Sequence, residues 1–80
     1  MPIPTAVSIE LTDEERALLE SFTRRHTSAQ ALALRARIVL DAADGFTNGE
    51  IAERQRVSRP TVTKWRGRFA EFRVDGVLVV

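Results

Sequence analysis

Apolar residues recur at helical spacing in four successive blocks of the chain, and polar turn residues separate the blocks. The apolar residues of the first block are Leu18, Leu19 and Phe22. Thr12 and Glu15 flank its start at the spacing of a capping box, in which each side chain satisfies a backbone N–H group that the helix start leaves unpaired. The pattern therefore predicts a first helix over about residues 13–25.

The second block is apolar around most of its circumference. Thr27 and Gln30 repeat the capping-box spacing at its start, and Gly45 can end it because glycine adopts the left-handed conformation without steric cost. The apolar positions between them are Ala31, Leu32, Leu34, Ala36, Ile38, Val39, Leu40, Ala42 and Ala43. A helix with apolar residues on most sides is expected to be the central one, with neighbours on more than one face.

A short polar turn separates the third block from the fourth. Thr47 and Glu50 form another capping box, which predicts a short helix that ends at about Gln55. Ser58 is the next helix cap, and Pro60 lies in the first turn, where its missing N–H group costs nothing. The apolar stripe of this fourth helix consists of Val62, Trp65, Phe69 and Phe72.

The two ends of the chain lack a helical pattern. Residues 1–10 are expected to form a flexible arm, and the fourth helix is expected to end at about residue 72 or 73, before Asp75-Gly76. The apolar run at residues 77–80 is interpreted as a C-terminal tail or as the start of a further element. The sequence thus predicts an all-α fold, a compact four-helix bundle over residues 11–76.

The composition narrows the possible chemistry. The chain of 80 residues has no cysteine and a single histidine, His26, which excludes disulfides, thiolate zinc sites and histidine-rich metal clusters. We therefore expect no cofactor, no metal and no small-molecule substrate. The longest nearly apolar run, residues 38–43, is too short to cross a membrane, and the N-terminus has no signal-peptide pattern. The expected location is the cytoplasm.

The net charge of +1 hides an uneven distribution. Residues 1–45 carry five arginines against seven acidic residues, whereas residues 46–80 carry seven basic residues against four acidic ones. Six of these basic residues lie between Arg54 and Arg68, a segment without any acidic residue. Such a segment is typical of contact with nucleic acid, and a solvated helix face is the alternative interpretation.

Residues 47–69 have the organisation of a helix-turn-helix, with a three-residue turn at residues 56–58. In this motif the first helix crosses the phosphate backbone, and the second places its N-terminal end in the major groove of DNA. Ala52 is small enough for the two helices to approach closely. The apolar residues expected to fix their angle are Ile51, Val57, Val62 and Trp65. We therefore expect the chain to bind double-stranded DNA and to be located at the nucleoid.

The outward positions of this motif carry suitable donors. Arginine and lysine pair with guanine in the major groove, and threonine offers a hydroxyl to a base edge or a methyl to thymine. The residues expected to contact bases are Ser58, Arg59, Thr61, Thr63 and Lys64. The residues expected to contact phosphates are Thr47, Arg54, Arg66 and Arg68.

Other conspicuous residues have structural interpretations. The aromatic stripe of the fourth helix is assigned to the core, and the acids at residues 13–15 favour the positive end of the first helix dipole. His26 is interpreted as a solvated residue at a helix end. Arg35 and Arg37 are expected to pair with acids of the first helix, with DNA contact as the alternative.

Several segments of the chain resemble a known family. They are residues 11–16, 34–40 (Leu-Arg-Ala-Arg-Ile-Val-Leu), 51–54, 57–62 and 65–66. Together they are similar to the N-terminal helix-turn-helix, or homeodomain-like, region of bacterial insertion-sequence transposases of the mariner-like superfamily. The resemblance covers roughly residues 9–76. It implies a homeodomain-like bundle that recognises the terminal inverted repeats of a transposable element.

The resemblance also implies a catalytic domain with an acidic triad, which these residues do not contain. We therefore expect the chain to bind transposon ends without acting as an enzyme. It would be the DNA-binding part, or a truncated copy, of a transposase. In a full-length protein its further partner would be a catalytic domain or a second copy.

The turn departs from the family pattern at Gln55-Arg56, where an apolar residue and a glycine are usual. A non-glycine residue in a left-handed turn costs about 1 kcal/mol, and Gln55 loses apolar burial. Two other functions stay open. A stand-alone transcriptional regulator would share the fold and the groove contacts, and a helical protein-interaction module would bind no nucleic acid.

Overall fold

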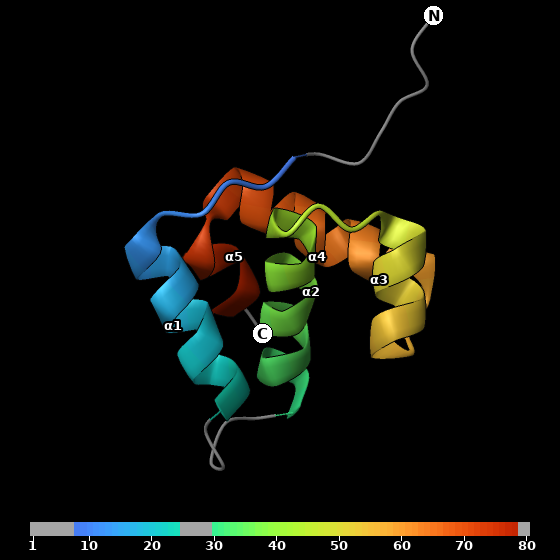
Figure 1. Cartoon of the computed structure of the whole chain (residues 1–80), viewed down its shortest axis with the longest axis horizontal. Helices are drawn as coiled ribbons and strands as arrows, with labels where there is room; N and C mark the ends of the chain where they lie inside the picture. The colour runs from blue at the N-terminus through green and yellow to red at the C-terminus, as the bar shows by residue number, and fades with distance from the viewer. Residues whose placement is uncertain (1–7, 25–29, 79–80) are drawn as a thin grey trace, which may run out of the picture.

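The structure, a computed structural model, describes residues 8–24 and 30–78, which form five helices (Figure 1). In chain order these are α1 (Asp13–Arg24), α2 (Gln30–Ala43), α3 (Asn48–Gln55), α4 (Arg59–Phe72) and α5 (Val74–Leu78). The described residues contain no strand, so the predicted all-α class is confirmed. The first four helices correspond to the four predicted ones, and α5 is an addition to them.

Capping boxes fix the starts of α1 and α3. Glu15 N donates to Thr12 Oγ1 at 3.0 Å, and Thr12 N donates to Glu15 Oε1, also at 3.0 Å. Glu50 N and Thr47 N make the same reciprocal pair of bonds at 3.1 and 2.8 Å. Both predictions are confirmed, whereas the box expected at Thr27 lies outside the described residues.

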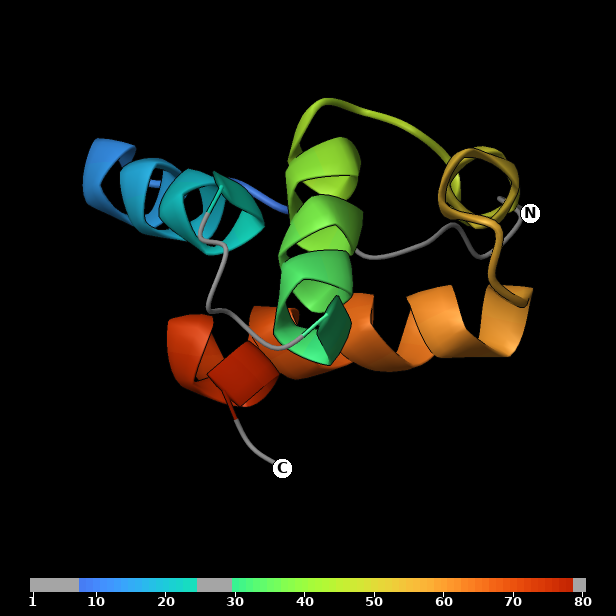
Figure 2. The same cartoon turned by 90° about the horizontal axis from the view of Figure 1, so that it is seen from below.

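The central helix of the bundle is α2. It packs against α1, α3, α4 and α5. Figure 2 shows α2 crossing over α4, with α1 on one side of it and α3 on the other. Ala36, Ile38 and Val39 are fully buried because neighbouring helices cover α2 on several faces. The central position predicted from its apolar circumference is confirmed.

Buried residues of all five helices form one core. Its largest fully buried side chains are Leu19, Ile38, Val39, Ile51, Val62, Phe69 and Val77. Two residues of the predicted stripes lie outside it, since Leu18 is 40% exposed and Phe72 is 50% exposed. Leu18 precedes the fully buried Leu19 and so points about 100° away from it around the helix. Phe72 is the last residue of α4, at the point where the chain turns away from the core toward α5.

The C-terminal residues form a helix where a tail was predicted. Arg73 adopts a positive φ of 59° after α4, and α5 then packs back onto α4. Gly76 permits this close approach, because a Cβ at this position would overlap the carbonyl oxygen of Arg68. Val77 is fully buried. In the described residues 77–78 the predicted tail is therefore wrong, and the alternative interpretation as part of a further element agrees with α5.

The segment before α1 also contributes to the core. Residues 1–7 of the arm predicted over residues 1–10 lie outside the described part of the chain. In the described remainder, Ile9 is only 5% exposed and belongs to the core. This end of the predicted arm is therefore part of the packed unit.

An ion pair joins the start of α1 to the end of α4. Arg73 Nη2 and Nε donate to the two carboxylate oxygens of Glu15 at 2.7 and 3.0 Å, and Nη2 also donates to Glu10 O at 2.6 Å. The hydrogen bonds from Arg73, followed by the one from Thr12 N, lower the pKa of Glu15 from 4.5 to about 2. The carboxylate in turn raises the pKa of Arg73.

Candidate nucleic-acid interface

A turn of three residues joins α3 to α4, as the sequence predicts. Arg56 adopts the left-handed conformation (φ 57°, ψ 48°), and Val57 N donates to a carbonyl group near the end of α3 at 3.0 Å. Ser58 then caps α4, since its Oγ accepts from Thr61 N, and Pro60 occupies the first turn. The predicted helix-turn-helix is confirmed, with an arginine at the left-handed position.

The inner face of the motif contains the predicted residues. Ile51, Ala52, Val62 and Trp65 are buried, and Val57 is half-buried against the core. These side chains pack α3 against α4 and both helices against α2. The start of α4 is thus held at a defined angle to α3.

Gln55 makes polar contacts where an apolar residue would be usual. Its Nε2 donates to Asp41 Oδ2 at 2.9 Å, and its Oε1 accepts from Arg37 Nε at 3.0 Å. Arg54 Nε donates to the same Asp41 oxygen at 3.1 Å. Asp41 is only 7% exposed, so these donors satisfy a carboxylate that would be costly to bury alone. Gln55 therefore lacks the burial of an apolar residue, but its hydrogen bonds connect α3 to α2.

The two arginines of α2 have partners other than the expected acids of α1. Arg37 donates to Gln55 of α3. Arg35 Nη1 donates to Val77 O at 3.2 Å, and its guanidinium lies 4.0 Å from the centroid of the Trp65 ring. The expectation of ion pairs with α1 is therefore wrong, because both side chains reach toward the other helices.

The residues predicted to contact bases lie at the start of α4 and differ in exposure. Ser58, Arg59, Thr63 and Lys64 are exposed. Thr61 is half-buried, and its hydroxyl lies 3.0 Å from Ser58 Oγ, within the cap. Four of the five side chains are therefore open to solvent, and their contact with bases stays a prediction.

Arg59 lies against the first turn of α3. A Cβ added at Gly49 would lie 2.9 Å from Arg59 Nη2, so the glycine leaves the space that the guanidinium occupies. The arginine at the start of α4 and the N-terminal turn of α3 therefore share one edge of the motif.

Asn48, the first residue of α3, bridges the two helices of the motif. Its Nδ2 donates to Thr63 Oγ1 at 3.2 Å, and its Oδ1 accepts from Arg66 Nη1 at 2.9 Å. Asn48 is not among the residues that the sequence predicted to contact DNA. No signal in the sequence marks it, because the contact depends on the angle between α3 and α4.

Three of the four predicted phosphate contacts retain exposed surface. Thr47 is exposed at the start of α3, and the Arg54 side chain is 50% exposed although it pairs with Asp41. Arg68 is half-buried, and its Nε donates to Gly76 O at 3.2 Å. Phosphate contact by these residues stays a prediction, and Arg68 would have to share its guanidinium with α5.

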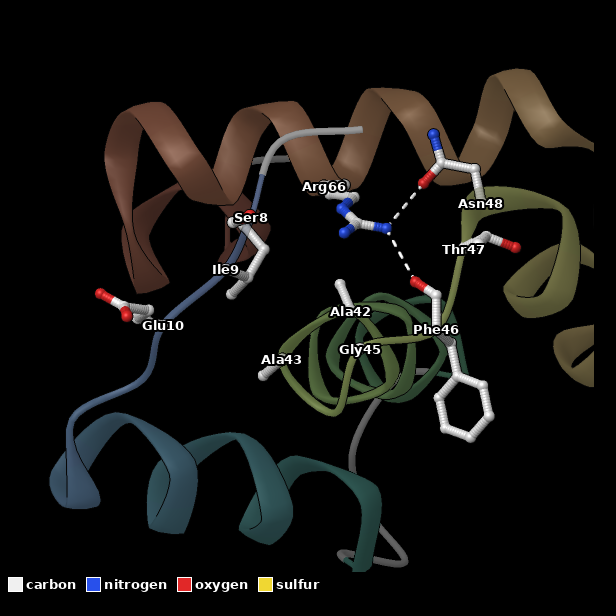
Figure 3. Close-up of a pocket in the computed structure, with 10 residues that line it drawn as sticks. All are labelled: Ser8, Ile9, Glu10, Ala42, Ala43, Gly45, Phe46, Thr47, Asn48 and Arg66. Carbon is white, nitrogen blue, oxygen red and sulfur yellow. Dashed lines mark hydrogen bonds between the residues drawn. The ribbon is translucent and has the colours of Figure 1, made fainter. Parts of the chain in front are cut away.

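Arg66 is directed into the protein, which corrects its predicted role at a phosphate. It is 7% exposed, and its Nη1 donates to Phe46 O at 3.0 Å and to Asn48 Oδ1 at 2.9 Å (Figure 3). Burial lowers its pKa. The helical spacing does signal this orientation, since Arg66 follows buried Val62 by four positions and precedes buried Phe69 by three.

A depression of about 720 Å³ adjoins this arginine, between residues 8–10, the end of α2 and the loop into α3 (Figure 3). The Arg66 guanidinium at its wall is already hydrogen-bonded to Phe46 and Asn48. Among the described residues, no group of three or more carboxylate, imidazole or thiol side chains could hold a metal ion. The depression therefore offers no set of metal ligands.

A capped three-residue turn between two helices, with basic and hydroxyl side chains exposed at the start of the second, defines a helix-turn-helix DNA-binding domain. The family model of the homeodomain-like domain matches residues 29–78, more than half of the sequence, and the chain belongs to this family. No curated protein and no solved structure matches the sequence. None of the helices in the described ranges has the length and apolarity needed to span a membrane.

Proposed function

We propose that the chain binds double-stranded DNA with sequence specificity and recognises the terminal inverted repeats of a transposable element. It would do so as the DNA-binding part, or a truncated copy, of a transposase. Membership of the homeodomain-like family supports DNA binding, and the resemblance to mariner-like transposases supports the inverted repeats as the target. The proposal assigns recognition and no chemical step to these residues. It places the protein in the cytoplasm at the nucleoid, with a catalytic domain or a second copy as a further partner.

The observation that carries the proposal is the exposed, acid-free start of α4. Arg59, Thr63 and Lys64 are exposed there, and residues 54–68 contain no acidic residue. Phosphate groups can approach this surface without repulsion from a carboxylate of the same segment. Arginine, lysine and threonine are also side chains that read base edges in the major groove.

Fluorescence anisotropy of the chain with labelled duplexes tests this proposal. One duplex carries an inverted repeat identified by sequencing the DNA that flanks the gene, and the other carries the same bases in scrambled order. We expect tighter binding to the inverted repeat, and an affinity that falls steeply as the salt concentration rises, because bound phosphates release counterions. Binding that is absent, or that does not depend on salt, would favour a protein-interaction module.

Arg59→Ala is expected to cost about 1 to 3 kcal/mol of specific binding and to relax the preference at one base position. Arg24→Ala is a matched control, because it removes the same charge from an exposed residue of α1. An unchanged ratio of affinities for the two duplexes in Arg59→Ala would remove Arg59 from the residues that read the sequence.

A stand-alone transcriptional regulator would use the same exposed side chains of α4. Nuclease footprinting across the gene and its flanks separates the two functions. Protection of inverted repeats would support the transposase-type target, and protection of a promoter alone would support the regulator.

A further inference from the structure

Three side chains form a relay from the interior of the protein to the start of α4. Arg66 Nη1 donates to Phe46 O and to Asn48 Oδ1 (Figure 3), and Asn48 Nδ2 donates to Thr63 Oγ1. Arg66 is 7% exposed, whereas Thr63 is exposed on α4. The relay begins at a buried cation and ends at a residue that we propose contacts a base.

Chemistry fixes the direction of each bond in this relay. A guanidinium group only donates, so the amide oxygen of Asn48 has to face Arg66. The amide NH2 group then faces Thr63, and because it also only donates, Thr63 Oγ1 is the acceptor at 3.2 Å. A flipped amide would place two donors against each other at Arg66. The orientation of Asn48 therefore follows from the position of the buried arginine.

The hydroxyl hydrogen of Thr63 stays available for another acceptor. A hydroxyl has one hydrogen and two lone pairs, and Asn48 occupies one of the lone pairs. Among the described residues, the Thr63 hydroxyl makes one hydrogen bond, which it accepts from Asn48 Nδ2. Because Thr63 is exposed, its hydrogen can point toward a molecule that approaches α4.

We infer that Asn48 is a positioning residue that presents Thr63 to DNA as a hydrogen-bond donor, so that the domain selects against cytosine at the base that Thr63 contacts. The inference rests on the proposed binding of DNA through α4. In the major groove guanine offers its N7 and O6 acceptors and thymine its O4, whereas cytosine offers only the N4 amino donor. Because Asn48 Nδ2 occupies one lone pair of Thr63 Oγ1, the hydroxyl keeps its hydrogen and one lone pair. It therefore pairs more readily with the acceptors of guanine and thymine than with the donor of cytosine.

Selection from a randomised DNA duplex library tests this inference with the full chain and three variants. Thr63→Val removes the hydroxyl at nearly constant shape and identifies the base position that Thr63 reads. At that position the unaltered chain is expected to disfavour cytosine by about 3- to 10-fold, the range of a single hydrogen bond. Thr63→Val is expected to lose this discrimination.

The variants of Asn48 test its role separately. Asn48→Asp can accept from Arg66 and from the Thr63 hydroxyl, which leaves Thr63 as an acceptor, so the same position should shift toward cytosine or adenine, whose amino groups donate. The added charge lowers affinity for all sequences alike, and the ratio between sequences is therefore the readout. Asn48→Ala frees the hydroxyl to rotate and should relax the preference without reversing it. Circular dichroism confirms that each variant is folded.

The outcomes separate the inference from the proposed function. If the chain selects no sequence and binds no duplex, the proposed function fails and the inference fails with it. If the chain selects DNA but the Asn48 variants leave the preference at the Thr63 position unchanged, the inference alone is overturned. A shift toward cytosine or adenine in Asn48→Asp, together with loss of the preference in Thr63→Val, supports it.

Discussion

Arg56 holds the left-handed conformation that allows α3 to turn into α4 within three residues. Its φ of 57° brings Cβ close to the following carbonyl oxygen, which costs a non-glycine residue about 1 kcal/mol. The backbone N–H of Arg56 still donates to the carbonyl groups of Ala52 and Glu53 in α3. The strain is therefore confined to the Cβ atom, and a single substitution can remove it.

Arg56→Gly is expected to raise the free energy of unfolding by up to about 1 kcal/mol, because glycine has no Cβ to strain. The greater freedom of glycine in the unfolded chain offsets part of the gain. Urea denaturation followed by circular dichroism measures the change. Arg54→Gly, at a helical position of α3, is the control and should lose stability. If Arg56→Gly lowers the free energy of unfolding, the left-handed conformation of Arg56 is not a source of strain.

Arg66 has an interior role although it lies in the same basic segment as the exposed arginines. Arg66→Met keeps much of the side-chain volume but leaves Phe46 O and Asn48 Oδ1 without this donor. We expect a loss of about 1 to 3 kcal/mol in the free energy of unfolding, the usual cost of an unsatisfied buried group. The dependence of DNA affinity on salt should be unchanged, because a side chain that is only 7% exposed is not expected to contact a phosphate.

Arg54→Met is the matched variant for this measurement, since the Arg54 side chain is half exposed. A phosphate contact at Arg54 predicts a slope of log affinity against log salt that is smaller by about 1. A smaller slope of log affinity against log salt in Arg66→Met would show that Arg66 contacts a phosphate after all.

At the scale of the helices, the packing of α5 on α4 depends on a glycine. A Cβ at Gly76 would overlap the carbonyl oxygen of Arg68, which is backbone and cannot move aside cheaply. Gly67, in the middle of α4, would place a Cβ in open space, with no atom within 4 Å apart from its chain neighbours and the nearby backbone of its own helix. The two glycines therefore form a natural pair for measuring the α4–α5 contact.

Gly67→Ala is expected to raise the free energy of unfolding by about 1 kcal/mol, because alanine is the better helix former. Gly76→Ala is expected to lower it, because α5 would have to move away from α4 and expose the fully buried Val77. Chemical denaturation of both variants measures the contrast. Equal effects of the two substitutions would show that α5 does not pack closely on α4.

At the scale of the whole molecule, the Glu15–Arg73 ion pair connects residues that are 58 positions apart in the chain. The pKa of Glu15 is lowered to about 2 in the folded protein, so folding favours the ionised carboxylate. Its contribution is fully present above about pH 5 and is lost as the pH falls through the unfolded value toward the folded one. Arg73 is 45% exposed, and solvent screening limits the contribution to about 1 kcal/mol.

Glu15→Gln is therefore expected to reduce stability at pH 7 by about 1 kcal/mol and to flatten the fall in stability between about pH 5 and pH 2. Thermal unfolding at a series of pH values measures this. Glu14→Gln is the control, because it removes a neighbouring exposed carboxylate without touching Arg73. If the stability of Glu15→Gln still falls as steeply at acidic pH, this ion pair is not the cause of the fall.

The features predicted correctly from the sequence depend on interactions between residues that are close together along the chain. The caps at Thr12, Thr47 and Ser58 each depend on residues within one turn of the chain, so they are readable without knowledge of the fold. The left-handed residue at Arg56 follows from the family pattern, which usually has a glycine at this position of the turn. The same reasoning could not show that Leu18 is exposed, because neighbouring apolar positions on α1 compete for one contact with α2.

The sequence by itself determined the helical class, the first four helices, the helix-turn-helix and the acid-free basic segment, since these are properties of neighbours along the chain. The tertiary structure alone decided which polar side chains meet. Asn48 donates to Thr63, and Gln55 and Arg54 both donate to buried Asp41. These contacts depend on the angles between α2, α3 and α4. Such angles arise from the shared core, which brings together residues that no local pattern connects.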